Sequence, residues 1–257
     1  MSRVVLVTGA GGGIGRALCK RFLEAGDAVI ALDRNAASVE SLAAEFGAAR
    51  LTAIVADVSS QESVINAVGQ GVAAHGPVDV AVANAGGALG TTLAHTDAAA
   101  WRRDVELNLN GTYYTIEAVR AAMIERKRGA IVLIGSVNGL TSLGHPAYSA
   151  AKAGLVSYTK ALAMEFGPHG IRANIVCPGT VKTPAWRARV AQHPKIFEEL
   201  SKWYPLGDVA EPEDIADAVY FLASPQARVI TGVALPVDAG LMAGNRLMAN
   251  ELTLDPY

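Results

Sequence analysis

The chain has 257 residues, of which 51% are hydrophobic and 18% charged, and its formal net charge is −2. This composition excludes a disordered chain, the near-neutral charge gives no basic surface for nucleic acid or an anionic membrane, and no apolar run approaches the roughly 20 residues that span a bilayer. The two cysteines, Cys19 and Cys177, lie in apolar surroundings without Cys-x-x-Cys spacing, so we expect reduced thiols, no metal site and a cytoplasmic location.

Six short apolar runs rich in β-branched residues predict buried strands, each followed by a segment long enough for a helix. The predicted strands are Val4–Val7, Ala28–Leu32, Leu51–Ala56, Val78–Ala83, Ala130–Ile134 and Ile171–Val176. Because parallel neighbours need right-handed crossovers, this alternation predicts an α/β fold, a Rossmann-like doubly wound parallel sheet with helices on both faces. No linker or composition shift divides the chain, so we expect a single domain over residues 1–257.

A glycine-rich turn, Thr8 to Gly15, joins the first predicted strand to the first predicted helix. Glycines there permit a tight turn and the close approach of a pyrophosphate, whose charge a helix N-terminus favours. Ile14 occupies the place of the last glycine in the common Gly-x-Gly-x-x-Gly pattern, and glycines also serve turns without a ligand. The residues that we expect to contact a dinucleotide here are Gly9, Gly12, Gly13, Ile14 and Gly15.

Asp33 ends the second predicted strand, 18 residues after Gly15. A carboxylate at that position can accept both ribose hydroxyls of an adenosine and would repel a 2′-phosphate, which favours NAD over NADP. Arg34 is the residue that argues against this preference, because it could bind the 2′-phosphate of NADP; it could equally stack on adenine or face solvent.

Tyr148 and Lys152 are four residues apart in a segment with few helix breakers, so on a helix they share one face. An ammonium about 4 Å away could supply much of the roughly 4 kcal/mol that lowers the pKa of a tyrosine by ~3 units. Ser136, which follows the fifth predicted strand, could hold a substrate oxygen beside them. Each residue alone is commonplace, but the trio suits proton transfer coupled to hydride transfer at a carbinol carbon.

One long region, residues 179–210, shows neither a strand nor a long helix pattern, and its length favours a lid or substrate-binding loop. Basic residues outnumber acidic ones before Trp203; they are Lys182, Arg187, Arg189, His193, Lys195 and Lys202, against Glu198 and Glu199. The excess fits either an anionic substrate such as a sugar acid or sulfonate, or a solvated basic face without a ligand.

Taken in order, these motifs resemble the short-chain dehydrogenase/reductase family, in the branch of about this length, over roughly Val4 to Gly240. The motifs are Thr8 to Gly15, Asp57-Val58, Asn84-Ala85-Gly86, Asn108, Ser136, Tyr148 with Lys152, and Pro178-Gly179 followed by Thr183. The resemblance implies that Tyr148 is the acid/base, that Lys152 lowers its pKa and holds the nicotinamide ribose, and that Ser136 stabilises the substrate oxygen. It also implies that Asn108, within the predicted helical stretch Ala98–Ile124, holds a water linked to Lys152.

The resemblance implies further cofactor contacts. Asp57 and Val58 would hold the adenine, although Asp57 could otherwise cap a helix. The turn Asn84, Ala85 and Gly86 would pass under the cofactor, or be a simple turn after a strand. The segment that would orient the nicotinamide contains Pro178, Gly179, Val181 and Thr183.

Substrate contacts are expected over the carboxyl ends of the strands. The candidates are Ser136, Asn138, His145, Tyr148 and Trp186, together with Leu89 and Leu143. His145, three residues before Tyr148, either binds a substrate hydroxyl or caps the helix start beside Pro146.

The leading hypothesis is an NAD-linked dehydrogenase acting on a secondary alcohol of a sugar, polyol or hydroxy acid. The alternatives are an NADPH-linked reductase resembling the 3-ketoacyl carrier-protein reductases, which Arg34 favours, and a cofactor-binding regulator without turnover. The family resemblance implies a homo-oligomer, commonly a tetramer. The tail, residues 241–257, either crosses onto a neighbouring subunit, closes a pocket, or is a frayed end.

Overall fold

The computed structural model describes residues 2–254, and its centre is one parallel sheet. The strands are β1 (Val4–Thr8), β2 (Ala28–Asp33), β3 (Leu51–Val55), β4 (Val80–Ala83), β5 (Gly129–Ile134), β6 (Ile171–Pro178) and β7 (Ala234–Val237). They lie in the order β3-β2-β1-β4-β5-β6-β7, and every neighbouring pair is parallel. The doubly wound parallel sheet predicted from the sequence is therefore confirmed, with its topological switch between β1 and β4.

Strand β7 is the element of the sheet that the sequence did not predict. Its four residues include Pro236, and a proline normally argues against a strand because it cannot donate to the ladder. Here β7 lies at the edge of the sheet beside β6, where that missing donor is tolerated. The six predicted strands all form, with ends that differ by a residue or two.

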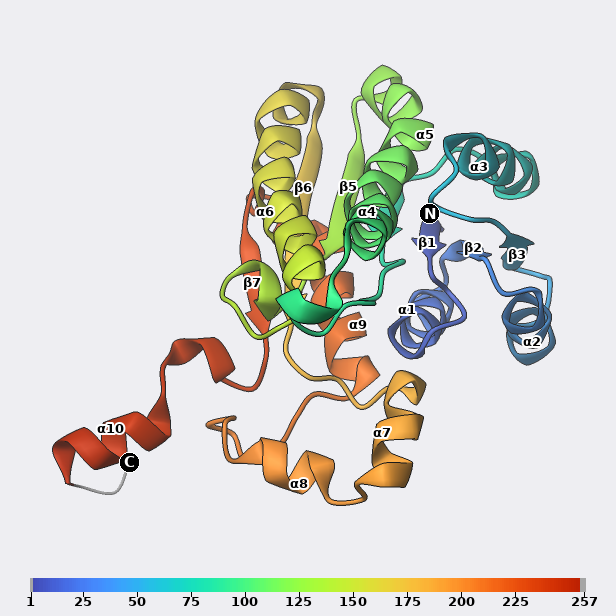
Figure 1. The fold of residues 1–257 in the computed structure, drawn as a ribbon. Coiled ribbons are helices and arrows are strands. Elements are labelled where there is room, and N and C mark those ends of the chain that lie inside the picture. The colour runs from blue at the N-terminus through green and yellow to red at the C-terminus, as the bar shows by residue number, and fades with distance from the viewer. Residues whose placement is uncertain (1, 255–257) are drawn as a thin grey trace.

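Helices cover both faces of the sheet (Figure 1). On one face lie α1 (Gly13–Glu24), α2 (Ala36–Phe46) and α9 (Pro212–Ala223); on the other lie α3 (Gln61–His75), α4 (Ala98–Val105), α5 (Gly111–Arg126) and α6 (Pro146–Phe166). Alternate side chains of each strand feed two separate cores: Val5 and Val7 pack toward α1 and α9, whereas Val4 and Leu6 pack toward α3, α5 and α6.

The helical stretch predicted over Ala98–Ile124 is not one regular α-helix. A π-helical turn, Glu106–Asn110, separates α4 from α5. Such turns accommodate an extra residue within a helix and occur frequently at functional sites. This one carries Asn108, which is completely buried.

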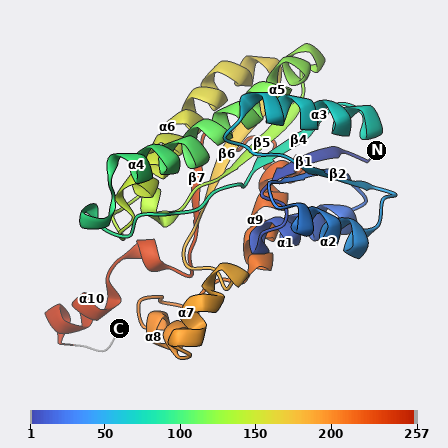
Figure 2. The same ribbon diagram turned by 45° about the vertical axis from the view of Figure 1, so that its right-hand side comes forward.

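The region predicted to be an irregular loop is partly helical. It holds a short 3₁₀ turn (Pro184–Trp186), α7 (Arg187–Gln192) and α8 (Ile196–Ser201), and residues 183–209 are called the lid below. The two ends of the lid are joined where Val181 pairs with Ala210 in a parallel bridge. Figure 2 shows the lid beyond the ends of β6 and β7, with α10 (Arg246–Thr253) projecting from the body beside it. None of the helices in residues 2–254 is long and apolar enough to cross a membrane.

Candidate active site

A cavity of about 1050 Å³ opens at the carboxyl ends of the strands, between the sheet and the lid. All the cofactor residues proposed from the sequence line it: Gly9, Gly12, Gly13, Ile14, Gly15, Asp33, Arg34, Asp57, Val58, Asn84, Ala85, Gly86, Pro178, Gly179, Val181 and Thr183. The proposed reacting groups line it too: Ser136, Tyr148 and Lys152. Parallel strands that end at one edge bring these distant segments together.

Most glycines of the turn after β1 are packed so closely that a side chain would not fit. A Cβ added to Gly15 would lie 2.1 Å from the carbonyl oxygen of Gly9, and one added to Gly13 would lie 2.9 Å from Thr183. At Gly12, by contrast, the nearest atom to an added Cβ is the Gly9 oxygen at 3.4 Å, an ordinary contact, and Gly12 lines the cavity. The turn therefore leaves room for a ligand at the N-terminus of α1, as a bound pyrophosphate requires.

Asp33, at the end of β2, faces the cavity with its carboxylate already oriented. The backbone N–H of Gly11 donates to Oδ2 and that of Asn35 donates to Oδ1, each at 2.9 Å. Two backbone donors leave further acceptor sites on the carboxylate for the hydroxyls of a ribose. The residues present therefore fit the adenosine half of a dinucleotide, and the exposed side chain of Arg34 lines the same end of the cavity.

Asp57 and Asn84 hold the loops around the nucleotide end. The Asp57 carboxylate accepts from the backbone and hydroxyl of Ser59 at 2.9 and 2.7 Å, and these bonds lower its pKa. It does not cap the next helix, because Ser60 is the N-cap of α3. Asn84 donates from Nδ2 to the carbonyl oxygens of Thr8 and Gly9 at 2.9 and 3.1 Å, which ties the ends of β4 and β1 together at the switch point.

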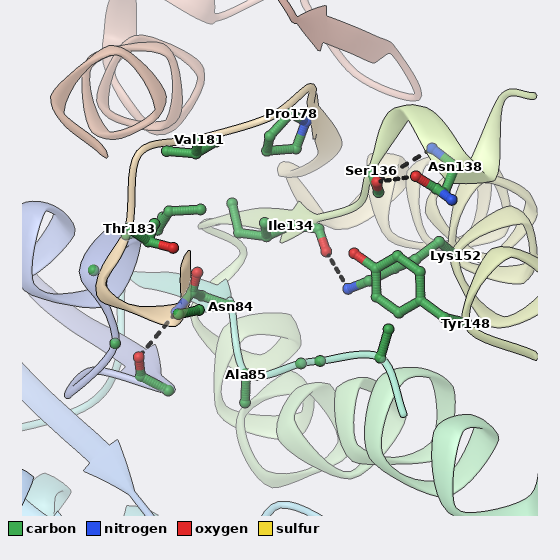
Figure 3. Close-up of a pocket in the computed structure, with 18 of the residues that line it drawn as sticks. Asn84, Ala85, Ile134, Ser136, Asn138, Tyr148, Lys152, Pro178, Val181 and Thr183 are labelled. Carbon is green, nitrogen blue, oxygen red and sulfur yellow. Dashed lines mark hydrogen bonds between the residues drawn. The ribbon is translucent and has the colours of Figure 1, made fainter. Parts of the chain in front are cut away.

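The proposed reacting groups meet in one wall of the cavity (Figure 3). Tyr148 and Lys152 stand one turn apart on α6, and Ser136 follows β5. The Lys152 ammonium lies 5.5 Å from the centre of the Tyr148 ring. Its hydrogen bond goes to the carbonyl oxygen of Ile134 at 2.8 Å, which holds α6 to the end of β5.

The titration of these groups differs from the sequence-based expectation. Burial raises the pKa of Tyr148 and the hydrogen bond with Ser136 opposes that rise, so the pKa of the tyrosine is not depressed in the protein alone. Burial also lowers the pKa of Lys152 to about 8. The prediction from spacing omitted the cost of desolvating both groups, which is the largest cause of both pKa shifts.

Asn108 does not line the cavity and lies behind its wall. Its side chain forms hydrogen bonds with both backbone groups of Gly87: the Gly87 N–H donates to Oδ1 at 3.0 Å, and Nδ2 donates to the Gly87 carbonyl oxygen at 2.8 Å. A Cβ on Gly86 would lie 2.7 Å from Asn108 Oδ1 and 3.2 Å from Lys152 Nζ, so this glycine permits the close approach of both side chains. Asn108 thus has a positioning role in the structure, and its contact with a water stays a prediction.

Asn138 lines the cavity, but its amide is engaged within the protein. Nδ2 donates to the carbonyl oxygen of Gly144 at 3.1 Å and to Ser149 Oγ at 3.2 Å, and the Asn138 backbone N–H donates to Ser136 Oγ at 3.1 Å. These bonds hold the start of α6 against Ser136. Asn138 therefore supports the wall more directly than it offers a free group to a substrate.

The lid completes the substrate end of the cavity. Leu143, His145 and Trp186 line it as expected, whereas Leu89 does not and is 55% exposed. Sequence reasoning missed several residues that also line it: Leu200, Trp203, Tyr204 and Leu241. The aromatic pair after the basic stretch was the available signal for Trp203 and Tyr204. Leu241 is the first residue of the tail, for which closing a pocket was one of the expectations, but no signal singled out this residue.

Most of the basic residues noted in and beside the lid do not line the cavity. Lys182 forms ion pairs with Asp208 and Glu211 at 3.0 and 2.9 Å. Among the six basic residues noted from the sequence, only Arg189 lines the cavity, where its guanidinium lies 4.9 Å from the centre of the Trp186 ring.

Comparisons with known proteins identify the family. A family model described as enoyl-(acyl carrier protein) reductase matches residues 9–242. An oxidoreductase of Burkholderia thailandensis, from the short-chain dehydrogenase/reductase family, has a solved structure that is 55% identical, covers 100% of this chain and 99% of its own, and superposes with a TM-score of 0.95. The chain belongs to the short-chain dehydrogenase/reductase family.

Two curated relatives extend this result. An uncharacterised oxidoreductase of Schizosaccharomyces pombe is 45% identical over 97% of this chain and 95% of its own length. Galactitol 2-dehydrogenase (L-tagatose-forming) of Cereibacter sphaeroides is 39% identical over 91% of this chain and 92% of its own. Among the similar solved structures, a 3-oxoacyl-[acyl-carrier protein] reductase of Brucella melitensis contains NAD and ElxO contains NADP. This chain is an oxidoreductase of a family that binds NAD or NADP.

Proposed function

We propose that this protein is an NAD-dependent dehydrogenase that converts a secondary alcohol of a sugar, polyol or hydroxy acid to its carbonyl. The observation that carries the proposal is a single cavity with an oriented Asp33 carboxylate at one end and the hydroxyls of Ser136 and Tyr148 at the other. The similarity to a galactitol dehydrogenase supports a polyhydroxylated substrate.

Each side chain has a distinct part in this chemistry. NAD, when bound, supplies the acceptor for a hydride from the carbinol carbon. Ser136 holds the substrate oxygen, the phenolic oxygen of Tyr148 takes the hydroxyl proton, and Lys152 stabilises the phenolate once the proton has left. Because burial raises the pKa of Tyr148, the tyrosine must lose a proton before oxidation, so alcohol oxidation becomes faster as pH rises.

The preference for NAD rests on Asp33. A carboxylate at the end of β2 would repel a 2′-phosphate on the adenosine ribose, and this repulsion disfavours NADP. Asp33→Ala is expected to raise the kcat/KM for NADP and to lower it for NAD. If NADP use stays unchanged, Arg34 already accommodates the phosphate and the proposal of NAD preference is wrong.

The direct test measures reduction of the cofactor. Purified protein is mixed with NAD or NADP and a panel of polyols, sugars, hydroxy acids and simple secondary alcohols, and the absorbance of the reduced cofactor is followed. Turnover with NAD and at least one polyhydroxylated alcohol supports the proposal. Turnover confined to NADPH with 3-ketoacyl thioesters would favour the second candidate, a ketoacyl reductase, which Arg34 at the nucleotide end supports.

Arg189 favours one alternative within the same activity. It is the cation that the lid brings to the cavity, and a guanidinium can bind a carboxylate with two parallel hydrogen bonds. A hydroxy acid is therefore the second substrate class. Arg189→Met should selectively weaken turnover of acids, and an equal effect on neutral alcohols would exclude this role.

We infer a cytoplasmic homotetramer for the assembly. Large apolar side chains are exposed on the α4, α5 and α6 side, among them Trp101 at 43%, Tyr113 at 44% and Met164 at 80%. Such exposed side chains on helices are suited to burial between subunits. Light scattering that gives the mass of one subunit would refute the assembly, and reduced Cys19 and Cys177 in protein isolated from cells would support the location.

A further inference from the structure

His145 is held in an unusual conformation at the first turn of α6. Its φ is 52° and its ψ 64°, a left-handed conformation that costs free energy for any residue with a side chain. The backbone N–H of His145 donates to the carbonyl oxygen of Thr91 at 3.0 Å, and ring Nδ1 lies 2.9 Å from the carbonyl oxygen of Gly90. Two successive carbonyls of the loop after β4 therefore fix both the backbone and the ring.

The contact with Gly90 determines which ring nitrogen carries the hydrogen. A carbonyl oxygen can only accept a hydrogen bond, so Nδ1 must be the donor. In the neutral imidazole the other nitrogen, Nε2, then has a lone pair and no hydrogen. The structure thus presents His145 as a hydrogen-bond acceptor.

This acceptor is open to the cavity. Nε2 has no hydrogen-bond partner among residues 2–254. Every buried side-chain nitrogen and oxygen in that part of the chain does have a partner, so Nε2 is not buried and is accessible. The ring lines the cavity and makes an edge-to-face contact with the ring of Tyr148, at 6.4 Å between ring centres and an interplanar angle of 78°. A substrate held at Tyr148 therefore lies beside His145.

The neighbouring polar groups do not compete for the same part of the substrate. Ser136 and Tyr148 serve the reacting oxygen, and both hydrogens of the Asn138 amide are donated to Gly144 and Ser149. We propose that His145 Nε2 accepts a hydrogen bond from a second hydroxyl of the substrate, next to the reacting carbinol. This inference rests on the proposed dehydrogenase activity and narrows it to vicinal diols, as found in sugars and polyols.

The acceptor also explains what the site rejects. A carboxylate or keto oxygen at the same position would face the lone pair of Nε2 without a hydrogen between them, and a plain alcohol would leave Nε2 unpaired after water is displaced. Vicinal diols are therefore selected over simple alcohols, and over acids whose carboxylate adjoins the carbinol.

The test compares matched alcohols in the wild type and His145→Asn. Asparagine tolerates the left-handed conformation but is too short to place an acceptor where Nε2 lies. The substrates are vicinal cyclohexanediol with cyclohexanol, and vicinal butanediol with secondary butanol. The wild type should prefer each diol in kcat/KM, and the variant should lose about tenfold of that preference, measured as the ratio of the kcat/KM of the diol to that of its matched simple alcohol. An unchanged preference in His145→Asn, or no preference in the wild type, would overturn the proposal.

His95→Asn is the matched control. His95 also lies in the loop region after β4 and also uses Nδ1 for a hydrogen bond, at 3.0 Å with Thr92 Oγ1, but it does not line the cavity. The diol preference of His95→Asn should equal that of the wild type. A loss of preference there would mean that the loop, and not the acceptor, is responsible.

A second measurement separates this inference from the proposed function. Nitrogen NMR of the histidine rings in the wild-type NAD complex should show hydrogen on Nδ1 of His145, and Nε2 should shift on addition of a vicinal diol but not of a simple alcohol. Hydrogen on Nε2 of the neutral ring would overturn the assignment even if the enzyme oxidises alcohols. Failure to oxidise any alcohol, with the Nε2 shift present, would refute the proposed function and leave the hydroxyl site standing.

Discussion

The two ends of the cavity are built differently. At the nucleotide end, backbone atoms and short side chains are packed so tightly that Gly15 has no room for a Cβ, and Asn84 ties two strand ends together. At the substrate end, the wall consists of long side chains on the lid, which is joined to the body at Val181–Ala210 and through Lys182. The difference teaches that the nucleotide end is shaped by the close packing of strand ends and turns, whereas the substrate end is shaped by side chains of the lid and of the segment before α6.

The largest effect is expected where the two ends meet, at Tyr148. Tyr148→Phe keeps the ring and removes the oxygen that moves the proton, so kcat should fall by about 10²–10⁴-fold while NAD affinity stays nearly unchanged. Steady-state kinetics with calorimetric NAD binding provide the check. Turnover within tenfold of the wild type would show that another group moves the proton.

The rigid nucleotide end should not tolerate a single added methyl group. In Gly15→Ala the new Cβ would meet the Gly9 oxygen, so we expect a loss of about 1–3 kcal/mol or more in the free energy of unfolding, together with weaker NAD binding. Urea unfolding and calorimetry measure both.

Gly69→Ala is its control. Gly69 lies on the exposed side of α3 with nothing within 4 Å of an added Cβ, and the substitution should stabilise the protein by up to about 1 kcal/mol. If both variants behaved alike, the close packing of the glycine turn would not be the cause.

Burial of Lys152 predicts a pH-dependent stability. Its pKa is about 8 in the folded protein, against an ordinary value of 10.5 in the unfolded chain, so between these values the unfolded chain binds a proton that the folded chain lacks, and stability rises with pH. Lys152→Met lacks this contribution. The free energy of unfolding of the wild type should therefore rise relative to that of Lys152→Met by about 2 kcal/mol from pH ~8 to pH ~9.5. The steepest expected rise is about 1.4 kcal/mol per pH unit. Urea unfolding of both proteins at several pH values tests this, and a constant difference would contradict it.

The smallest effect is expected at the join of the lid. Lys182→Met removes the ion pairs with Asp208 and Glu211, which are worth about 1 kcal/mol or less near the surface. We expect faster proteolysis within residues 183–209 and a few-fold higher KM for the alcohol, with unchanged NAD affinity. Lys20→Met, which removes only the weak pair with Glu24 on α1, is the control. Equal proteolysis of both variants would show that Lys182 does not restrain the lid.

Local patterns predicted the sheet, and they predicted the glycine turn and Asp33 that line one end of the cavity. Buried parallel strands are short apolar runs in the sequence. The glycine turn and Asp33 stand at the ends of two of these runs, so their positions in the fold could be predicted together with the strands. The spacing of Tyr148 and Lys152 likewise followed from helical geometry. These features depend on residues close together in the chain.

The remaining features depend on contacts between distant segments. Strand β7 was missed because Pro236 is acceptable only at an edge, and edges are a property of the whole sheet. Helices α7 and α8 have six residues each, too few for a clear periodicity. The pKa of Tyr148 depends on burial, and the orientation of Lys152 depends on the carbonyl of Ile134, neither of which spacing reveals.

The π-turn between α4 and α5 makes the register of a surface helix matter to the interior. Each residue of an α-helix turns the chain by about 100°, so removing one residue from Glu106–Asn110 would restore regular hydrogen bonding while swinging the Asn108 amide away from Gly87. A regular helix, shorter by one residue, would lose the hydrogen bonds that hold the loop containing Gly87. The irregular turn of the helix thus orients the Asn108 amide toward Gly87.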